Sequence, residues 1–275
     1  MRTICFLSDF GLSGDFVGTC RGVIEGIAPG ATVLDLTHHV PGFGIPAGAE
    51  VLEHATGYMP RGTVYLAVVD PGVGTERRAV ALRTAAGSYL VGPDNGLLVP
   101  ASRALGGVAE AVLLSDGRFH VHPVSTTFHG RDIFAPVAAH LAAGVGLGEV
   151  GESLDPGSLV PLSLPGTTRT GLGDLETEII SIDRFGNARL SVTQEEAGLE
   201  HGTQIELDPG DGRVRCSYQE TFGASGFGAL IVVPDSHRRL SISINQGNAA
   251  RALALSVGDR VRIRPLDECQ DDAGA

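Results

Sequence analysis

Basic residues are scarce in this sequence, and Trp is absent. The 275 residues include 20 Lys and Arg against 32 Asp and Glu, which gives a formal net charge of −12. Such a charge repels phosphate backbones and anionic membrane surfaces. We therefore expect no nucleic-acid partner and no membrane partner, whereas a cationic small molecule is compatible with the balance of charge.

Cysteine pairs and long apolar runs are also missing. No two cysteines form a CxxC pair or a disulfide-framework spacing, which disfavours zinc ribbons and disulfide scaffolds and favours free thiols in a reducing cytosol. No apolar run approaches the length of a membrane span, and the N-terminal run ICFL is too short for a signal peptide. We expect a cytoplasmic protein. The cysteines are Cys5, Cys20, Cys216 and Cys269.

The first half of the chain alternates short apolar runs with longer helix-compatible stretches. Such alternation is typical of a largely parallel sheet covered by helices. The segment IFAPVAAHLAAG has apolar residues on nearly every side, which indicates a helix packed against the sheet. We predict strands at 3–7, 32–36, 63–69, 79–83, 88–92 and 111–114, and helices at 16–27, 45–59 and 133–144.

The second half has a different character. Residues 151–174 carry several prolines and glycines without sustained periodicity, so they are the best candidate for a linker. Beyond them, short alternating segments are separated by Gly, Pro or Asp turns, a pattern that predicts a small all-β barrel or sandwich. We expect an α/β domain over residues 1–165, a β domain over 175–266 and a fraying tail over 267–275.

The segment VDPGVGTERR, residues 69–78, combines an acid, a glycine-rich turn and two arginines. It follows a predicted strand, so Asp70 is expected at the carboxyl end of that strand, where open α/β sheets build their binding crevices. Glycines permit a tight turn or a close approach to a ligand. A hairpin turn closed by a structural Asp–Arg pair explains the same residues equally well.

Two other polar segments border predicted helices. Asp9, in SDFG, directly follows the first predicted strand and is suited either to a ribose diol or to forming a turn. His129, in FHGRD, precedes the helix at 133–144 and is either a group that positions or deprotonates water or an ordinary loop histidine. Asp15 and Asp132 stand where helix-capping residues are expected.

In the second half, IDRFGN ends a predicted strand at residues 182–187. Its Asn187 is able to pair with the N6/N7 edge of adenine, and its Phe supplies a stacking face, although an ordinary turn has the same composition. The polar turn PDSHRR, residues 234–239, and the segment NQG, residues 245–247, are further places where backbone groups are presented to a ligand.

Metal and phosphate motifs are weak. HVH, residues 120–122, is predicted to place two imidazoles on one strand face, and His38 and His39 form a second pair, but neither has further ligands at a usable spacing. The Walker motif is absent. GLGEVG, residues 146–151, follows a predicted helix instead of joining a strand to a helix, so it is a poor dinucleotide fingerprint. We expect no bound metal and no cofactor.

Together, SDFG, VDPGVGTERR, FHGRD, DRFGN and NQG occur in this order across essentially the whole chain. In this combination the sequence resembles the S-adenosylmethionine hydroxide adenosyltransferase family, whose relatives include fluorinating and chlorinating enzymes. The resemblance implies an N-terminal α/β domain and a C-terminal β-barrel domain. It also implies a homotrimer in which the ligand site lies between the N-terminal domain of one subunit and the C-terminal domain of its neighbour.

The family's hydrolases cleave S-adenosylmethionine to adenosine and methionine by attack of activated water or hydroxide at C5′. The resemblance implies that three residues surround this water and that the remaining site residues hold ribose, adenine and the methionine amino and carboxylate groups. The water-handling residues are Asp70, Arg77 and His129, and the substrate-binding residues are Asp9, Asp183, Asn187, Ser236, Asn245 and Gln246.

Two departures from the halogenating relatives bear on the reaction. Those relatives place a Tyr where this chain has Asp70, whose negative charge repels a halide, so the resemblance favours water as nucleophile. Near Ser236, the arginine of the fluorinating branch is replaced by His237. The alternatives are a halide-using adenosyltransferase that makes 5′-chloro-5′-deoxyadenosine, and a non-catalytic protein that binds S-adenosylmethionine or adenosine.

Overall fold

A computed structural model describes residues 1–163, 165–170, 173–210 and 212–266. The chain divides into two compact units, Met1–Ser163 and Leu164–Ala275. Cys5, Cys20 and Cys216 are buried free thiols. Cys269 and the tail predicted to fray, residues 267–275, lie outside the described residues. Among the residues described, no helix is long and apolar enough to cross a membrane.

The first unit is built on a seven-stranded sheet with the order β2-β1-β3-β5-β4-β6-β7. The pairs β1–β2, β1–β3 and β3–β5 are parallel, whereas β4, β6 and β7 pair antiparallel to their neighbours. The predicted parallel sheet is confirmed for the four neighbouring strands β2, β1, β3 and β5. The strands are β1 (Ile4–Ser8), β2 (Val33–Thr37), β3 (Val64–Val68), β4 (Ala79–Thr84), β5 (Tyr89–Pro93), β6 (Val108–Leu113) and β7 (Glu152–Leu154).

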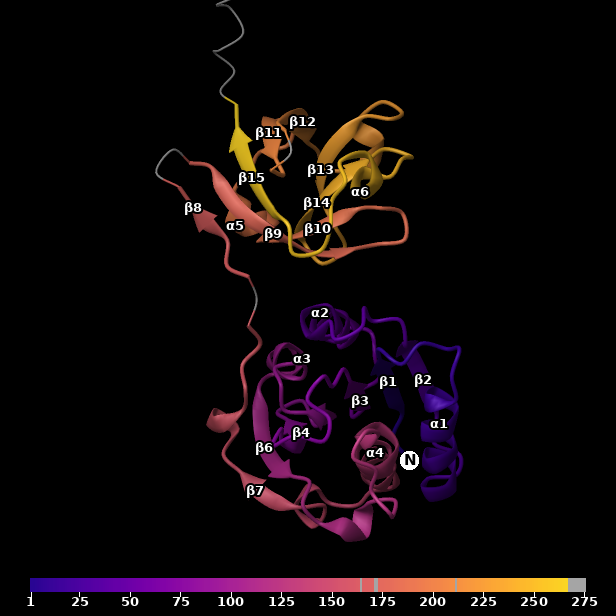
Figure 1. Ribbon diagram of the computed structural model, residues 1–275. Coiled ribbons are helices and arrows are strands. Elements are labelled where there is room, and N and C mark those ends of the chain that lie inside the picture. Colours follow the sequence, from indigo (N-terminus) through magenta and orange to yellow (C-terminus); the bar gives the residue numbers. More distant parts are fainter. Residues whose placement is uncertain (164, 171–172, 211, 267–275) are drawn as a thin grey trace, which may run out of the picture. The chain divides into compact units, whose positions relative to one another are not determined.

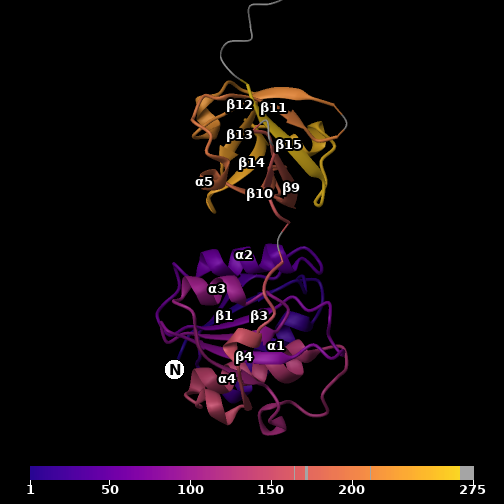
Figure 2. The ribbon, with the colours of Figure 1, turned by 90° about the vertical axis from the view of Figure 1, so that its left-hand side faces the viewer.

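Helices cover both faces of this sheet, as Figures 1 and 2 show. Alternation within β1 separates the two layers: Ile4 and Phe6 join the core under α1 and α4, and Cys5 and Leu7 join the core under α2 and α3. Burial on both faces explains why the central strands are apolar runs without alternation. The helices are α1 (Phe16–Ile27), α2 (Ile45–Ala55), α3 (Val99–Ala104) and α4 (Ala135–Ala143).

Two helices differ from their predicted bounds. Helix α2 ends at Ala55, four residues before the predicted end. Just after it, the Thr56 hydroxyl donates a hydrogen bond to the Glu53 carbonyl, and Tyr58 N donates to the Ala55 carbonyl to form a turn. The helix predicted at 133–144 begins as a π-helical turn, Gly130–Phe134, that runs into α4. This extra turn begins directly after His129 and therefore determines the direction in which the His129 side chain points.

The HVH segment is not a strand, which corrects the prediction for residues 120–122. It follows a short 3₁₀ helix, Gly117–Phe119, and precedes a cis bond to Pro123. The His122 ring hydrogen-bonds to the Gly117 carbonyl at 2.8 Å, so this histidine closes a local turn. Proline lacks an N–H for a sheet ladder, which is why the alternating letters here do not make a strand.

The second unit is a closed barrel of seven strands. The hydrogen-bonded order is β10-β14-β13-β12-β11-β15-β9-β8, and pairing of β10 with β9 closes the ring and leaves β8 outside it. Alternate side chains point inward and form one core that includes Ile179, Tyr218 and Ile242. The strands are β8 (Thr168–Arg169), β9 (Leu175–Ile182), β10 (Ala188–Thr193), β11 (Gln204–Asp208), β12 (Val214–Tyr218), β13 (Leu230–Pro234), β14 (Arg239–Ile244) and β15 (Arg260–Pro265).

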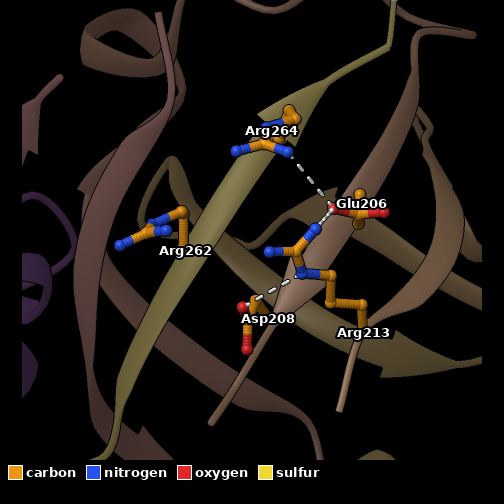
Figure 3. A pocket seen from close by; sticks show the side chains of 5 residues that line it. All are labelled: Glu206, Asp208, Arg213, Arg262 and Arg264. Atoms are coloured by element: carbon orange, nitrogen blue, oxygen red, sulfur yellow. Dashed lines mark ion pairs between the residues drawn. The ribbon is translucent and has the colours of Figure 1, made fainter. Parts of the chain in front are cut away.

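Strands β11 and β15, together with the residue before β12, carry a cluster of arginines and carboxylates (Figure 3). Arg213 lies 3.3 Å from Glu206 and 3.5 Å from Asp208, and Arg264 also approaches Glu206 at 3.6 Å. The arginines that line this surface pocket therefore face carboxylates of the same barrel. Such mutual compensation makes the cluster an ion network between strands and leaves little net charge to attract an anionic ligand.

Candidate active site

The carboxyl edge of the first sheet gathers three of the sequence motifs. Because β1 and β3 are parallel, the residues that follow them, Asp9 and Asp70, emerge at the same edge. Arg77 lies just before β4, at the end of the turn that begins with Asp70. His129 enters from the π-helical turn ahead of α4, which packs on β1 and β3. The sheet topology therefore brings together residues from the SDFG, VDPGVGTERR and FHGRD motifs.

Asp70, Arg77 and His129 form one hydrogen-bonded cluster. Arg77 donates Nε to Asp70 Oδ1 at 3.0 Å and an Nη to Asp70 Oδ2 at 2.5 Å, and the same Nη lies 3.0 Å from His129 Nδ1. The side chains of Asp70 and Arg77 are only 6% and 7% exposed. The remaining Nη of Arg77 donates to the Arg78 carbonyl at 3.1 Å, which fixes the plane of the guanidinium.

The geometry also fixes the protonation of His129. A guanidinium only donates hydrogen bonds, so Nδ1 is the acceptor and the neutral ring carries its proton on Nε2. Burial and the charge of Arg77 lower the pKa of His129, which agrees with a neutral ring. Burial raises the pKa of the Asp70 carboxyl, and Arg77 opposes that rise. Asp70 thus has a higher proton affinity than an ordinary aspartate.

Two glycines allow the loops of this site to touch. Gly74 has φ of +77°, and a Cβ there would meet the Thr126 carbonyl oxygen at 2.4 Å. A Cβ on Gly130 would meet Phe10 Cζ at 2.8 Å. The glycine-rich turn therefore packs against the loop before His129, and the residue after His129 packs against the SDFG loop. Any larger side chain at either position would separate loops that carry the site.

Aromatic rings complete the wall between the SDFG and FHGRD loops. Phe10 and Phe128 meet edge to face with centroids 5.7 Å apart, and Phe16 lies 4.8 Å from Phe128. The Arg77 guanidinium stands 5.3 Å from the centroid of Phe134. Apolar surroundings of this kind strengthen the electrostatic contacts that they enclose.

Asp9 points its carboxylate toward a different loop. Its Oδ2 accepts a hydrogen bond from Phe43 N at 3.1 Å, while Oδ1 accepts none from the residues that the structure describes. The negative charge of Asp9 also contributes to raising the pKa of Asp70. Asp9 is thus part of the same edge as the catalytic candidates, with one carboxylate oxygen left for another donor.

Neither predicted helix cap is observed. Asp15 occupies the residue before α1, but its side chain makes no capping hydrogen bond. Asp132 lies inside the π-helical turn, fully buried, and accepts hydrogen bonds from Arg131 and from Ser125 N. Burial alone would raise the pKa of Asp132, but these hydrogen bonds outweigh it and lower the pKa. Asp132 anchors the loop that leads to His129, so the capping interpretation was wrong for it.

Sequence reasoning missed the residues that support Asp70 from behind. Asn95 donates its amide to the Val69 carbonyl at 2.9 Å, directly beside Asp70. Arg78 pairs with the buried carboxylate of Asp94, 2.5 Å away, and reaches the Ser158 carbonyl. In the sequence, the acid and the amide of PDNG, residues 93–96, are the signal that could have indicated a polar support there.

In the second unit, the DRFGN turn uses its own polar groups. Asp183 Oδ1 accepts from Phe185 N and Asn187 N, and Asp183 Oδ2 accepts from the Asn187 amide at 2.8 Å. This is the hydrogen-bond pattern of an Asx turn, closed through Gly186 with φ of +85°. The side-chain Oδ1 of Asn187 accepts no hydrogen bond from described residues, so it is available to an external donor.

The other predicted binding residues lie at the two ends of β14. Asn245 follows its last residue and donates its amide to the Ser225 carbonyl, and both of its main-chain groups bond to the loop 226–229. Gln246 has φ of +57°, and its main-chain groups make no hydrogen bond to described residues. Ser236 lies in the turn before β14. A six-residue strand, about 20 Å long, separates this turn from Asn245.

No group of three or more His, Cys, Asp or Glu among the described residues is arranged to hold a metal ion. The cluster that the first unit assembles instead is an acid, an arginine and a neutral histidine in a mostly buried setting. Chemically, such a cluster is suited to orient a water molecule and to take a proton from it.

Comparisons with known proteins fit this arrangement. Residues 4–151 match the model of the SAM hydroxide adenosyltransferase N-terminal domain, and residues 177–262 match that of the C-terminal domain. The (R)-S-adenosyl-L-methionine hydrolase of Salinispora arenicola is 43% identical over 94% of this chain and 97% of that protein. A fluorinase of Actinopolyspora mzabensis is 30% identical, over 94% and 96% respectively.

A crystal structure of a conserved protein from Thermotoga maritima has the same fold. It superposes with a TM-score of 0.85 at 35% identity and covers 95% of this chain and 99% of that one. The two family models together span most of the sequence, and each lies within one of the two compact units. The chain belongs to the SAM hydroxide adenosyltransferase family.

Proposed function

We propose that this protein hydrolyses (R)-S-adenosyl-L-methionine to adenosine and L-methionine. The observation that carries the proposal is the Asp70–Arg77–His129 cluster, a water-handling arrangement in a chain that is 43% identical to a named hydrolase of this substrate. The negative net charge of the protein also suits a sulfonium cation.

The reaction is a substitution at C5′. A water oxygen forms a bond to C5′ as the C5′–S bond breaks, and the electron pair of that bond returns to sulfur, which leaves as the neutral thioether of methionine. One water proton is released. Because a neutral thioether is a good leaving group, the protein needs no general acid and no Lewis acid; its task is to orient and partly desolvate the water.

Asp70 is the proton acceptor in this proposal. The Nδ1 atom of His129 already accepts from Arg77, and its Nε2 carries a proton, so the neutral ring orients the water by donating to it. The raised pKa of Asp70 suits a group that must take a proton as the C–O bond forms. Arg77 holds both carboxylate oxygens and stabilises the negative charge that develops on the water by charge-assisted bonding.

The substrate is held by the remaining residues named from the sequence. We assign the ribose hydroxyls to Asp9, the adenine edge to Asn187 with main-chain groups of Asn245 and Gln246, and the methionine groups to Asp183 and Ser236. The protein acts as a cytoplasmic homotrimer with its site at the subunit interface, and it needs neither metal nor cofactor. Activity that survives EDTA and a trimer mass in solution are the expected results.

Isotope labelling tests the reaction itself. In ¹⁸O-labelled water, the wild-type protein should place the label in the 5′-hydroxyl of adenosine, as read by mass spectrometry. Adenosine without the label would exclude attack by water, and the absence of any product would exclude the hydrolase. Parallel incubations with the (R) and (S) sulfonium epimers should give faster turnover of the (R) form.

A halide-using adenosyltransferase is the second candidate, because a fluorinase is 30% identical over nearly the whole chain. Against it stands Asp70, a mostly buried carboxylate at the position of the nucleophile. Reactions with chloride or fluoride in excess should yield adenosine alone. Formation of 5′-chloro- or 5′-fluoro-5′-deoxyadenosine in proportion to halide would favour the alternative.

A further inference from the structure

Behind the active-site edge, Ser8 and His38 form a buried polar contact that the proposed reaction does not use. The Ser8 hydroxyl lies 2.8 Å from His38 Nδ1, and the two residues are 0% and 3% exposed. Ser8 is the last residue of β1, and His38 is the first residue after β2. The pair therefore joins the carboxyl ends of two adjacent parallel strands.

Asp35 selects the tautomer of His38. Its Oδ1 lies 3.3 Å from His38 Nε2, an electrostatic contact outside hydrogen-bond geometry, and Arg21 holds its Oδ2 at 2.8 Å. An Nε2 lone pair facing this carboxylate would be repelled, so Nε2 carries the proton and Nδ1 accepts from the Ser8 hydroxyl. The hydroxyl oxygen in turn lies 3.4 Å from Phe10 N, which donates to it.

Ser8, His38 and Asp35 are the three residue types of a hydrolytic triad, but they do not work as one. The Ser8 hydroxyl is fully buried, so no substrate atom reaches it. The His38 ring also packs edge to face on Phe6 with centroids 4.6 Å apart, which closes the remaining side. A fixed polar contact inside a packed core positions its neighbours and does not attack a substrate.

The neighbours are the two loops that hold Asp9. Gly11 N donates to the His38 carbonyl at 2.7 Å, and Val40 N lies 3.4 Å from the Ser8 carbonyl. Farther along the same loop, Phe43 N donates to Asp9 Oδ2 at 3.1 Å. Contacts before and after Asp9 therefore attach the SDFG loop to residues 38–43, and the Ser8–His38 contact lies at the base of this attachment.

We propose that His38, acting through Ser8, is a positioning residue that orients Asp9 toward the ribose diol of the substrate. This role rests on the hydrolase function proposed above. Without His38, the Ser8 hydroxyl loses the acceptor that holds its direction, and without Ser8, Phe10 N loses its own acceptor; in both cases Asp9 loses its fixed direction. Among the described residues, the side chains of Asp70, Arg77 and His129 hydrogen-bond only within this cluster and to the Arg78 carbonyl, so the chemical step keeps its groups.

Three variants of the full chain separate positioning from structure. Asn offers an acceptor where His offers Nδ1, whereas Gln offers its polar end near Nε2, so His38→Asn should keep the wild-type KM and His38→Gln should not. Ser8→Ala and His38→Gln should raise KM for S-adenosylmethionine about five- to tenfold, the effect of about one hydrogen bond, and leave kcat within about twofold. The matched control is Ser102→Ala, another buried serine whose hydroxyl bonds within α3.

A substrate lacking the diol tests the link to Asp9. With the 2′,3′-dideoxy analogue, wild type and Ser8→Ala should have nearly equal KM, because the contact that Ser8 supports is already missing. A KM penalty that persists on the analogue, or that appears equally in Ser102→Ala, would overturn the positioning role, as would equal KM values for all variants. Failure of the wild type to hydrolyse either substrate would instead remove the hydrolase function.

Discussion

The two units differ in how complete their functional groups are. In the first unit, Asp70, Arg77 and His129 hydrogen-bond to one another in a single buried cluster. In the second, the side chains of Asp183 and Asn187 hydrogen-bond to each other within one turn, and Ser236 stands at the far end of β14 from Asn245. One chain thus assembles the Asp70–Arg77–His129 cluster by itself, while the residues that we propose for adenine and for the methionine groups remain spread over the barrel.

This difference separates two kinds of expected defect. Asp70, Arg77 and His129, which we propose to act on the water, contribute to the chemical step, so their loss should lower kcat. Groups that await the substrate contribute binding, so their loss should raise KM. The variants that follow are ordered from the largest expected effect to the smallest, and each asks whether this division between the units is correct.

Asp70→Asn should be the most damaging change. The amide has the same shape but does not accept the water proton, so kcat should fall about 10²- to 10⁴-fold, the usual contribution of a general base. Steady-state kinetics with adenosine quantified by chromatography would measure the loss, and circular dichroism would verify the fold. A kcat close to wild type would remove Asp70 from the proton transfer.

Arg77→Lys should cost less, about 10- to 100-fold in kcat. Lysine keeps the positive charge but lacks the planar fork that spans both Asp70 oxygens and His129 together. Arg78→Lys is the matched control, because Arg78 pairs with Asp94 behind the site and this variant should show a smaller loss. Equal losses in the two variants would mean that the site responds only to the stability of this turn.

The pH dependence should show an acid limb. In the proposal Asp70 acts as its carboxylate, and because burial raises its pKa, kcat/KM should begin to fall with decreasing pH above the ordinary aspartate value of about 4. His129 has a lowered pKa, so it stays neutral over most of this range. A pH series of kcat/KM measures the limb, and a rate that is flat down to about pH 4 would contradict it.

Asn187→Ala should be the mildest change, with KM raised about fivefold and kcat nearly unchanged, because about one hydrogen bond to adenine is lost. The inosine-type analogue, which lacks the adenine amino group, should bind both proteins equally. If kcat fell as strongly as in Asp70→Asn, the division of labour between the two units would be wrong.

Much of the fold followed from local patterns in the sequence. Short apolar runs predicted β1, β3 and the other central strands. The turn that follows Val69 predicted that Asp70 lies at a strand end. Insertion of β5 between β3 and β4 depends on long-range pairing, which no local pattern specifies. HVH alternates like a strand, but the proline that follows it and a local ring contact decided its structure.

The site was predicted unevenly for similar reasons. Asp70 and Arg77 were found because they share one short motif. Asn95 and Asp94 were missed because their role depends on which strands are neighbours. Asp15 stands at the predicted helix start, but its side chain makes no capping hydrogen bond. Asp132 does not cap a helix because it is buried and bonds to the nearby Arg131 instead. Residue type and spacing indicate chemistry; the tertiary contacts decide which partner a side chain takes.

The π-helical turn at Gly130–Phe134 makes the active site sensitive to chain length as well as to residue identity. Helix α4 is buried along nearly its whole length, so its apolar contacts fix its rotation. Deleting one residue from the π turn would restore ordinary helical spacing and rotate everything ahead of it by about 100°. His129 would then point away from Arg77 although every named side chain was still present, so an insertion or deletion here is equivalent to removing the histidine.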